Sequence, residues 1–146
     1  MSRNSTSLHL LSTIPATPDQ VFGAWTGRKK MERWTHPDPN AGVEVDVDLR
    51  VGGRYSICLE VEDGHVTAHG TYREVDPPRR LVYTWSWKEP HPMRAETLVT
   101  LEFARAEGGT EIRLSHDGFP TVDDREGHEV GWNICLERLV DLMSER

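Results

Sequence analysis

Alternation of apolar and polar residues dominates the middle of this chain and restricts the folds that it can adopt. The pattern occurs in a series of short segments: 43–47, 54–61, 66–75, 81–87, 96–103 and 110–116. Turn sequences such as EDGH, DPPRR and EGG separate them. Successive side chains of a strand point to opposite faces, so each segment predicts a strand with one apolar face. Short turns favour antiparallel neighbours. The sequence therefore predicts a meander of about six antiparallel strands.

The segments on either side of the meander complete the predicted fold. Residues 6–14 alternate in the same way and predict one more strand. Thr17 and Pro18 are typical of a helix start and predict a short helix, followed by one or two turns over 28–34. Residues 122–143 predict a long helix whose core stripe comprises His128, Trp132, Cys135, Leu139 and Leu142. We expect one domain over 1–146, of the α+β class. A curved antiparallel sheet of six to seven strands should wrap around the long C-terminal helix, with two short helices between strands one and two.

Composition and charge argue against some classes of binding partner, namely nucleic acids and membranes. The 146 residues are 36% hydrophobic and 28% charged, with a net charge of −7 and no basic run, which argues against nucleic acid. No apolar run is long enough for membrane insertion, and the start MSRNSTS does not resemble a signal peptide. Cys58 and Cys135 predict reduced core thiols, and hence a cytoplasmic protein. The excess of arginine over lysine favours a bacterial source, and a homodimer stays open.

Several blocks of the sequence, taken in order, resemble a known superfamily. The blocks are IPATPDQVFGAWTGRKKMERW, VGGRYSI, GTYREVDPPRRLVYTW, GGTEIRLSHDGF and GHEVGWNICLERL. Together they resemble the START-like, or Bet v 1-like (SRPBCC), helix-grip superfamily, in the branch named after the C-terminal domain of the Hsp90 ATPase activator Aha1. The resemblance covers residues 8 to 143. It implies a fold and a cavity but no single reaction, because the superfamily includes lipid and steroid carriers, hormone receptors and polyketide cyclases. The chain lacks room for the activator's separate N-terminal domain, so we do not expect chaperone activation.

The expected binding site is a cavity between the sheet and the long helix. A small hydrophobic or amphipathic molecule is the expected ligand, and no cofactor is expected. Residues on inward stripes or at the mouth of the fold should line the cavity: Trp34, Tyr55, Ile57, Trp85, Phe119, His128 and Trp132, with His116 deeper inside. Tryptophan offers a large apolar surface with one polar group. The alternative interpretation is that these aromatic residues and histidines are ordinary core residues.

Catalysis is the main functional alternative. A cyclase-like or dehydratase-like enzyme could use His116 or His128 as general acid or base. The sequence has no nucleophile elbow and no HExxH or CxxC metal motif. The glycine pairs at 52–53 and 108–109 do not open helices, so they predict turns and not phosphate sites. His9 and His91 should be exposed, and His36 should lie at a rim or in a solvated turn. A protein-interaction module in stress response or chaperone regulation is the third hypothesis.

The sequence GHEVGW at the start of the long helix holds two helix-weakening glycines. We expect Gly131 to let a neighbouring backbone or ring approach closely, while His128 and Trp132 point toward the cavity. Replacing Gly131 by leucine should then overpack the helix seam and cost about 1–3 kcal/mol.

Overall fold

The computed structural model of this protein describes residues 6–144, and its body is one antiparallel sheet of seven strands. The strands are β1 (Ser7–Ile14), β2 (Val43–Val47), β3 (Arg54–Val61), β4 (Gly64–Asp76), β5 (Arg80–Trp87), β6 (Thr97–Ala106) and β7 (Gly109–Asp117). Their order across the sheet is β1-β7-β6-β5-β4-β3-β2. The segment from β2 to β7 is therefore the predicted meander, and β1 adds to it beside β7.

Glycines at the turns allow the tight connections between strands. Gly52 lies between β2 and β3, Gly108 lies between β6 and β7, and both have a φ of 86°. That left-handed region suits glycine because it lacks a Cβ atom. The prediction that these glycine pairs form turns is confirmed.

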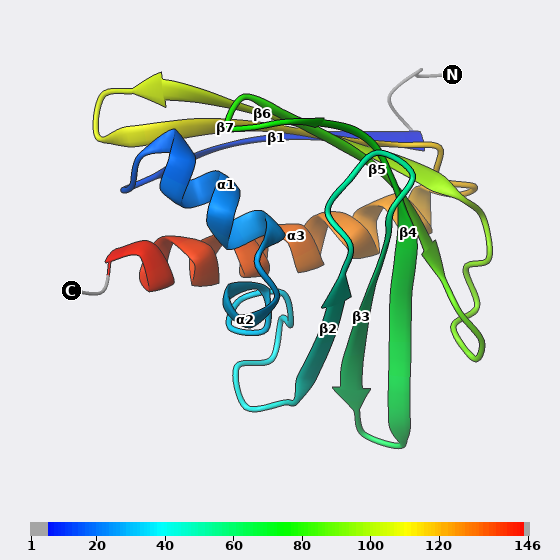
Figure 1. The fold of residues 1–146 in the computed structure, drawn as a ribbon. Coiled ribbons are helices and arrows are strands. Elements are labelled where there is room, and N and C mark those ends of the chain that lie inside the picture. The colour runs from blue at the N-terminus through cyan, green and yellow to red at the C-terminus, as the bar shows by residue number, and fades with distance from the viewer. Residues whose placement is uncertain (1–5, 145–146) are drawn as a thin grey trace.

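The sheet is strongly bent, and β4 carries the irregularity that helps to bend it. The register of β4 against β5 shifts between Tyr72 and Glu74, which marks a bulge. Nearby, a Cβ atom on Gly70 would lie 1.9 Å from the backbone oxygen of Thr84 on β5. Only glycine therefore fits the close approach of the two strands. The bent sheet arches over the helices (Figure 1).

Two short helices lie between β1 and β2: α1 (Pro18–Thr26) and α2 (Arg28–Met31). Thr17 caps α1, because its side chain accepts a hydrogen bond from the backbone of Gln20 while the Gln20 side chain accepts one from the backbone of Thr17. The buried face of α1 presents Trp25 to the interior. The predicted helix start is confirmed.

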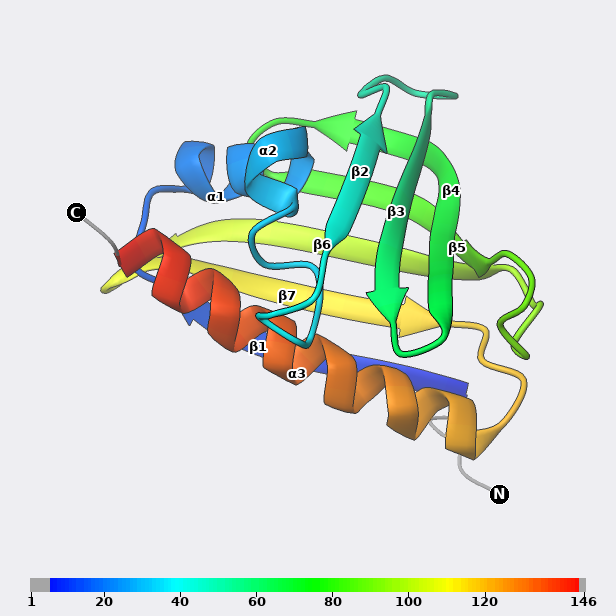
Figure 2. The same cartoon turned by 90° about the horizontal axis from the view of Figure 1, so that it is seen from below.

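The long helix α3 (Val122–Ser144) crosses the concave side of the sheet and runs alongside β1 (Figures 1 and 2). Thr121 precedes it and its hydroxyl oxygen accepts a hydrogen bond from the backbone of Asp124 at 3.0 Å. The buried residues of α3 are Trp132, Cys135, Leu136 and Leu139. The predicted fold class is confirmed, including the long helix and the two short helices between the first strands.

His36 corrects one detail of the sequence prediction. Its side chain is buried, with 7% of its surface exposed, and it makes two hydrogen bonds. Nε2 lies 2.7 Å from the carbonyl oxygen of Glu60 on β3, and Nδ1 accepts from the backbone of Asp38 at 2.9 Å. Nε2 therefore donates the first bond. The prediction of a rim or a solvated turn is wrong, because this ring holds the loop before β2 against β3.

Candidate functional site

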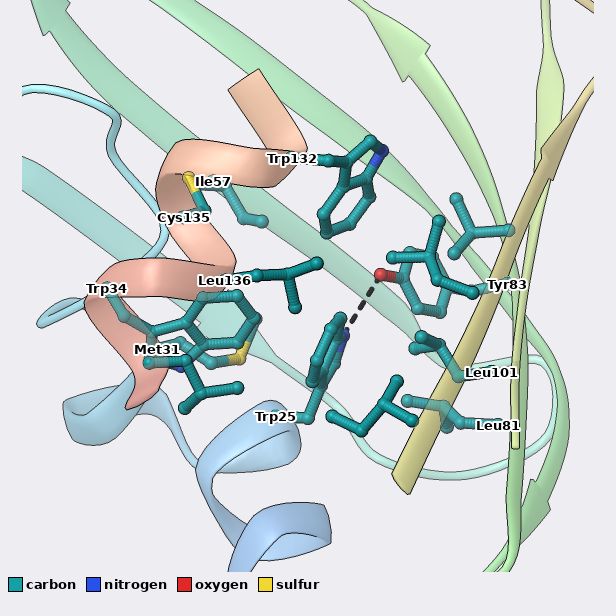
Figure 3. Close-up of a cluster of buried hydrophobic side chains, with 14 of the residues drawn as sticks. Trp25, Met31, Trp34, Ile57, Leu81, Tyr83, Leu101, Trp132, Cys135 and Leu136 are labelled. Atoms are coloured by element: carbon teal, nitrogen blue, oxygen red, sulfur yellow. Dashed lines mark hydrogen bonds between the residues drawn. The ribbon is translucent and has the colours of Figure 1, made fainter. Parts of the chain in front are cut away.

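A cavity of about 370 Å³ lies where α3 and the short helices face the inner side of β3 and β5. Its walls come from all of these elements and from nearby loops: Trp25, Met31, Trp34, Thr35, Pro37, Ile57, Leu59, Tyr83, Trp85, Trp87, His91, Asp123, Asp124, Gly127, His128, Gly131, Trp132 and Cys135. Figure 3 shows several of the inner side chains, with Trp25 and Trp132 reaching toward the same space from α1 and α3. The volume lies within the range of about 300–1,000 Å³ that is usual for ligand sites.

All five tryptophans of the chain line this cavity. Two of them, Trp25 and Trp34, are held in position by hydrogen bonds from their indole N–H groups. Trp25 donates to the hydroxyl oxygen of Tyr83 at 3.2 Å, as drawn in Figure 3, and Trp34 donates to the backbone oxygen of Ala24 at 2.9 Å. These bonds satisfy the polar group of each ring, so the carbon surfaces are what the rings offer to the cavity.

His116 is fully buried and its two ring nitrogens are both engaged. Nδ1 accepts from the Trp132 indole N–H at 3.0 Å, and Nε2 lies 2.7 Å from the Thr97 hydroxyl oxygen. That hydroxyl donates its own proton to the backbone oxygen of Trp85, so Nε2 donates to it. Burial first, and then repulsion from nearby His128 when that ring is protonated, hold the pKa of His116 well below its usual value of 6.5. His116 is therefore a neutral ring that orients Trp132.

His128 is a second histidine paired with a tryptophan. Its Nε2 accepts from the Trp87 indole N–H at 2.9 Å, and its Nδ1 donates to the backbone oxygen of Asp124 at 2.7 Å. Burial lowers the pKa of His128 below 6.5, and the hydrogen bond to Asp124 offsets part of that shift. His128 is thus also neutral near pH 7, in one defined tautomer.

These hydrogen bonds limit the chemistry that the cavity can perform. Neither His116 nor His128 has a free nitrogen for a substrate, so either ring would first have to break one of these hydrogen bonds before it could transfer a proton. Cys135 lines the cavity as a free thiol, and burial raises its pKa to about 12. A thiol with that pKa is a poor nucleophile at neutral pH. In this arrangement none of the three groups is free for proton transfer or nucleophilic attack.

Trp85 differs from the other tryptophans. Its indole nitrogen is buried and has no hydrogen-bond partner among residues 6–144. Its ring meets those of Trp87 and His116 edge to face, at centroid distances of 5.5 and 5.8 Å. A buried donor without an acceptor costs free energy, so packing against neighbouring rings, and not a hydrogen bond, holds Trp85 in place.

Gly127 and Gly131 line the cavity on α3, and the structure corrects the expectation for Gly131. A Cβ atom at either position would meet no other atom within 4 Å. The expectation that Gly131 permits a close approach is wrong, because nothing packs against it. Both glycines instead leave open space beside the first half of α3, where they line the cavity. They enlarge the cavity at a cost to helix stability.

The predicted ligand-contact residues divide into two groups. Those that line the cavity are Trp34, Ile57, Trp85, His128 and Trp132. Tyr55 instead lines a separate void of about 10 Å³, and His116 lies outside the cavity wall. Phe119 is also absent from the wall and packs on His116 and His128, with centroid distances of 4.3 and 4.8 Å. Contact of any of these residues with a ligand stays a prediction.

Other cavity residues were missed in the sequence. His91 was predicted to be exposed, but its ring stacks on Trp87 at 4.3 Å and lines the cavity. His91 lies in an irregular loop, where no periodicity of the sequence indicates which way a side chain points. Trp87 shares a face with Trp85, which was a usable signal. Asp123 and Asp124 could not be recognised as cavity residues in the sequence, because acidic residues are common in the first turn of any helix.

The part of the chain that the structure describes contains neither a metal-binding cluster nor a membrane-spanning helix. In residues 6–144 no group of three or more histidine, cysteine, aspartate or glutamate side chains is placed to hold a metal ion. No helix in that range is long and apolar enough to cross a membrane.

Several solved structures share this fold. Protein CV1439 from Chromobacterium violaceum is 22% identical, with a TM-score of 0.86 over 97% of this chain and 99% of that one. The AHSA1 (SPO3351) protein from Silicibacter pomeroyi is 22% identical, with a TM-score of 0.82 over 94% and 97% of the two chains. Protein Mll3558 from Rhizobium loti is 26% identical, with a TM-score of 0.79 over 93% and 95%. Likeness at this level supports the fold.

The family itself follows from the sequence. No curated protein matches this chain. The family described as "Activator of Hsp90 ATPase homolog 1-like protein" matches residues 15–144, which is nearly the whole chain. The resemblance seen in the sequence blocks is thereby confirmed, and the chain belongs to the Activator of Hsp90 ATPase homolog 1-like family.

Proposed function

We propose that this protein binds a small, mostly hydrophobic molecule in the cavity between the sheet and α3 and releases it unchanged. The observation that carries the proposal is a cavity of about 370 Å³ into which all five tryptophans of the chain are gathered. Aromatic walls give a large contact area at a low cost in side-chain entropy. An interior filled by side chains would have left no room for such a ligand.

The hydrogen bonds of the histidines support binding over conversion. His116 and His128 each use one nitrogen to accept from a tryptophan and the other to donate. They therefore fix the orientation of the aromatic wall. A cyclase or dehydratase would need at least one of these nitrogens to face its substrate.

The test is a titration followed by tryptophan fluorescence and by calorimetry. Decanol, dodecanol and 2-naphthol serve as probes, because they combine apolar bodies of different shape with a small neutral polar end. Every tryptophan lines the cavity, so binding should shift or quench the emission. Trp132→Ala should weaken binding at least about tenfold in calorimetry, because the ligand loses a large contact surface.

Val130→Ala is the matched control, since Val130 lies on the same helix with 60% of its surface exposed. That variant should bind as the unmodified protein does. Mass spectrometry of the recovered probes should find them unchanged. Conversion of a probe that is lost in His128→Ala would favour the enzyme hypothesis instead. Absence of both heat and emission change for all probes would refute a ligand-binding cavity and favour the interaction module.

A further inference from the structure

One side of the cavity mouth is negatively charged. Asp123 and Asp124 lie in the first turn of α3 and line the cavity. No lysine or arginine among the described lining residues balances that charge. Arg138 lies one turn beyond the lining residue Cys135, but its guanidinium donates to the backbone oxygens of His36 and Arg33.

The two carboxylates are in different situations. Asp124 accepts a hydrogen bond from the Thr121 hydroxyl at 2.9 Å, which belongs to the capping of α3. Asp123 is exposed and makes no hydrogen bond or ion pair with any residue that the structure describes. Both carboxylates also interact favourably with the positive end of the helix dipole. That end carries only about half a positive charge, so two carboxylates leave the mouth negative.

Aromatic rings lie next to this acidic pair. Trp87 donates to His128, and His128 donates to the backbone oxygen of Asp124. The Trp87 ring is therefore joined to the first turn of α3 through a single histidine. His91, stacked on Trp87, lies at the same end and is held neutral near pH 7, because burial lowers its pKa. Aromatic rings attract cations through the negative face of the π system.

We infer that the ligand of this cavity is a cationic amphiphile: an apolar body between the tryptophans and an ammonium or quaternary ammonium group at the mouth beside Asp123 and Asp124. The inference rests on the proposed function and names the class of molecule that the same cavity selects. A carboxylate or phosphate at the mouth would face two negative charges and no partner cation. An ammonium group would meet the exposed carboxylate of Asp123 while it remains partly hydrated, so little desolvation opposes it.

Three probes with the same dodecyl chain test the inference: dodecyltrimethylammonium, dodecanol and dodecanoate, each titrated below its micelle concentration. Affinity should fall in that order, with the ammonium probe binding about tenfold or more tighter than the carboxylate. Raising the ionic strength should reduce the advantage of the ammonium probe, because salt screens exposed charges.

Variants decide whether the preference comes from the mouth or from the net charge of −7. Asp123→Asn should weaken the ammonium probe about threefold or more and leave dodecanol unchanged. Asp141→Asn removes an exposed carboxylate near the other end of α3, outside the cavity, and should change neither. Thermal melting of both variants checks that they fold.

The outcomes separate the inference from the function on which it rests. Dodecanoate binding as tightly as dodecyltrimethylammonium, or an equal effect of Asp123→Asn and Asp141→Asn, would overturn the cationic ligand and leave a neutral or anionic ligand in the same cavity. Failure of all three probes to bind would overturn the proposed function, and the inference with it.

Discussion

Replacing Gly131 by leucine should stabilise the protein and close its cavity. Gly131 lies in the interior of α3 and lines the cavity, and a Cβ atom there would meet nothing within 4 Å. A leucine side chain can therefore extend into the cavity without displacing the sheet. The same change would destabilise a helix whose glycine packs against a neighbour.

The gain in stability comes mainly from helix propensity. Glycine is about 1 kcal/mol less favourable than alanine in a helix interior, and leucine is close to alanine. Gly131→Leu should therefore raise the free energy of unfolding by about 0.8 kcal/mol, with more from burial of the leucine against the aromatic wall. For a chain of this length the melting temperature should rise by about 2–3 °C. Urea unfolding and thermal melting measure both quantities.

Ligand affinity should change in the opposite direction. The leucine carbons would occupy space that a bound molecule would otherwise fill with about four of its own carbon groups. Each buried CH₂ contributes about 0.8 kcal/mol, so the loss is about 3 kcal/mol, or about a hundredfold in Kd. Isothermal titration with dodecanol measures the difference.

Gly23→Leu is the matched control for both measurements. Gly23 is an exposed helical glycine on α1 with nothing within 4 Å of its Cβ position, and it does not line the cavity. It should gain similar stability and keep full affinity. A loss of stability in Gly131→Leu would show that the glycine has a close neighbour after all. Unchanged affinity would show that ligands do not use this part of the cavity.

Three further predictions test the interior. Because burial lowers the pKa of His116 and His128, the unfolded chain binds more protons than the folded one below about pH 6.5. Their stabilising contribution is complete above that pH and is lost as the pH falls. The free energy of unfolding, measured with urea, should therefore decline between pH 7 and pH 5, and it should decline less steeply in His116→Gln. Trp132→Phe keeps an aromatic ring but leaves Nδ1 of His116 without a donor, and should lower the free energy of unfolding by about 1–3 kcal/mol in the same assay. No loss would mean that another donor replaces the indole. Gly70→Ala should lower the free energy of unfolding by about 3 kcal/mol, and the melting temperature with it, because its Cβ would lie 1.9 Å from the Thr84 oxygen. A mild effect there would show that β4 and β5 can separate at little cost.

The sequence alone determined the elements and their order. Alternation of apolar residues depends only on which side of a strand each side chain lies, so the meander could be predicted from local periodicity. Thr17 and Pro18 marked the first helix, and the stripe from His128 to Leu142 marked the inner face of the last. These signals are local, and tertiary contacts did not change them.

The tertiary structure decided what the interior contains. Trp87 and His128 are separated by 41 positions and Trp132 and His116 by 16, and only the packing of α3 against the sheet brings each pair together. Periodicity shows that a side chain points inward, but not whether the space beyond it is filled. Gly131 is the clearest case, because a glycine beside a packed neighbour and a glycine beside an empty cavity look the same in the sequence. The difference lies in the distance between two surfaces, which depends on the curvature of the whole sheet.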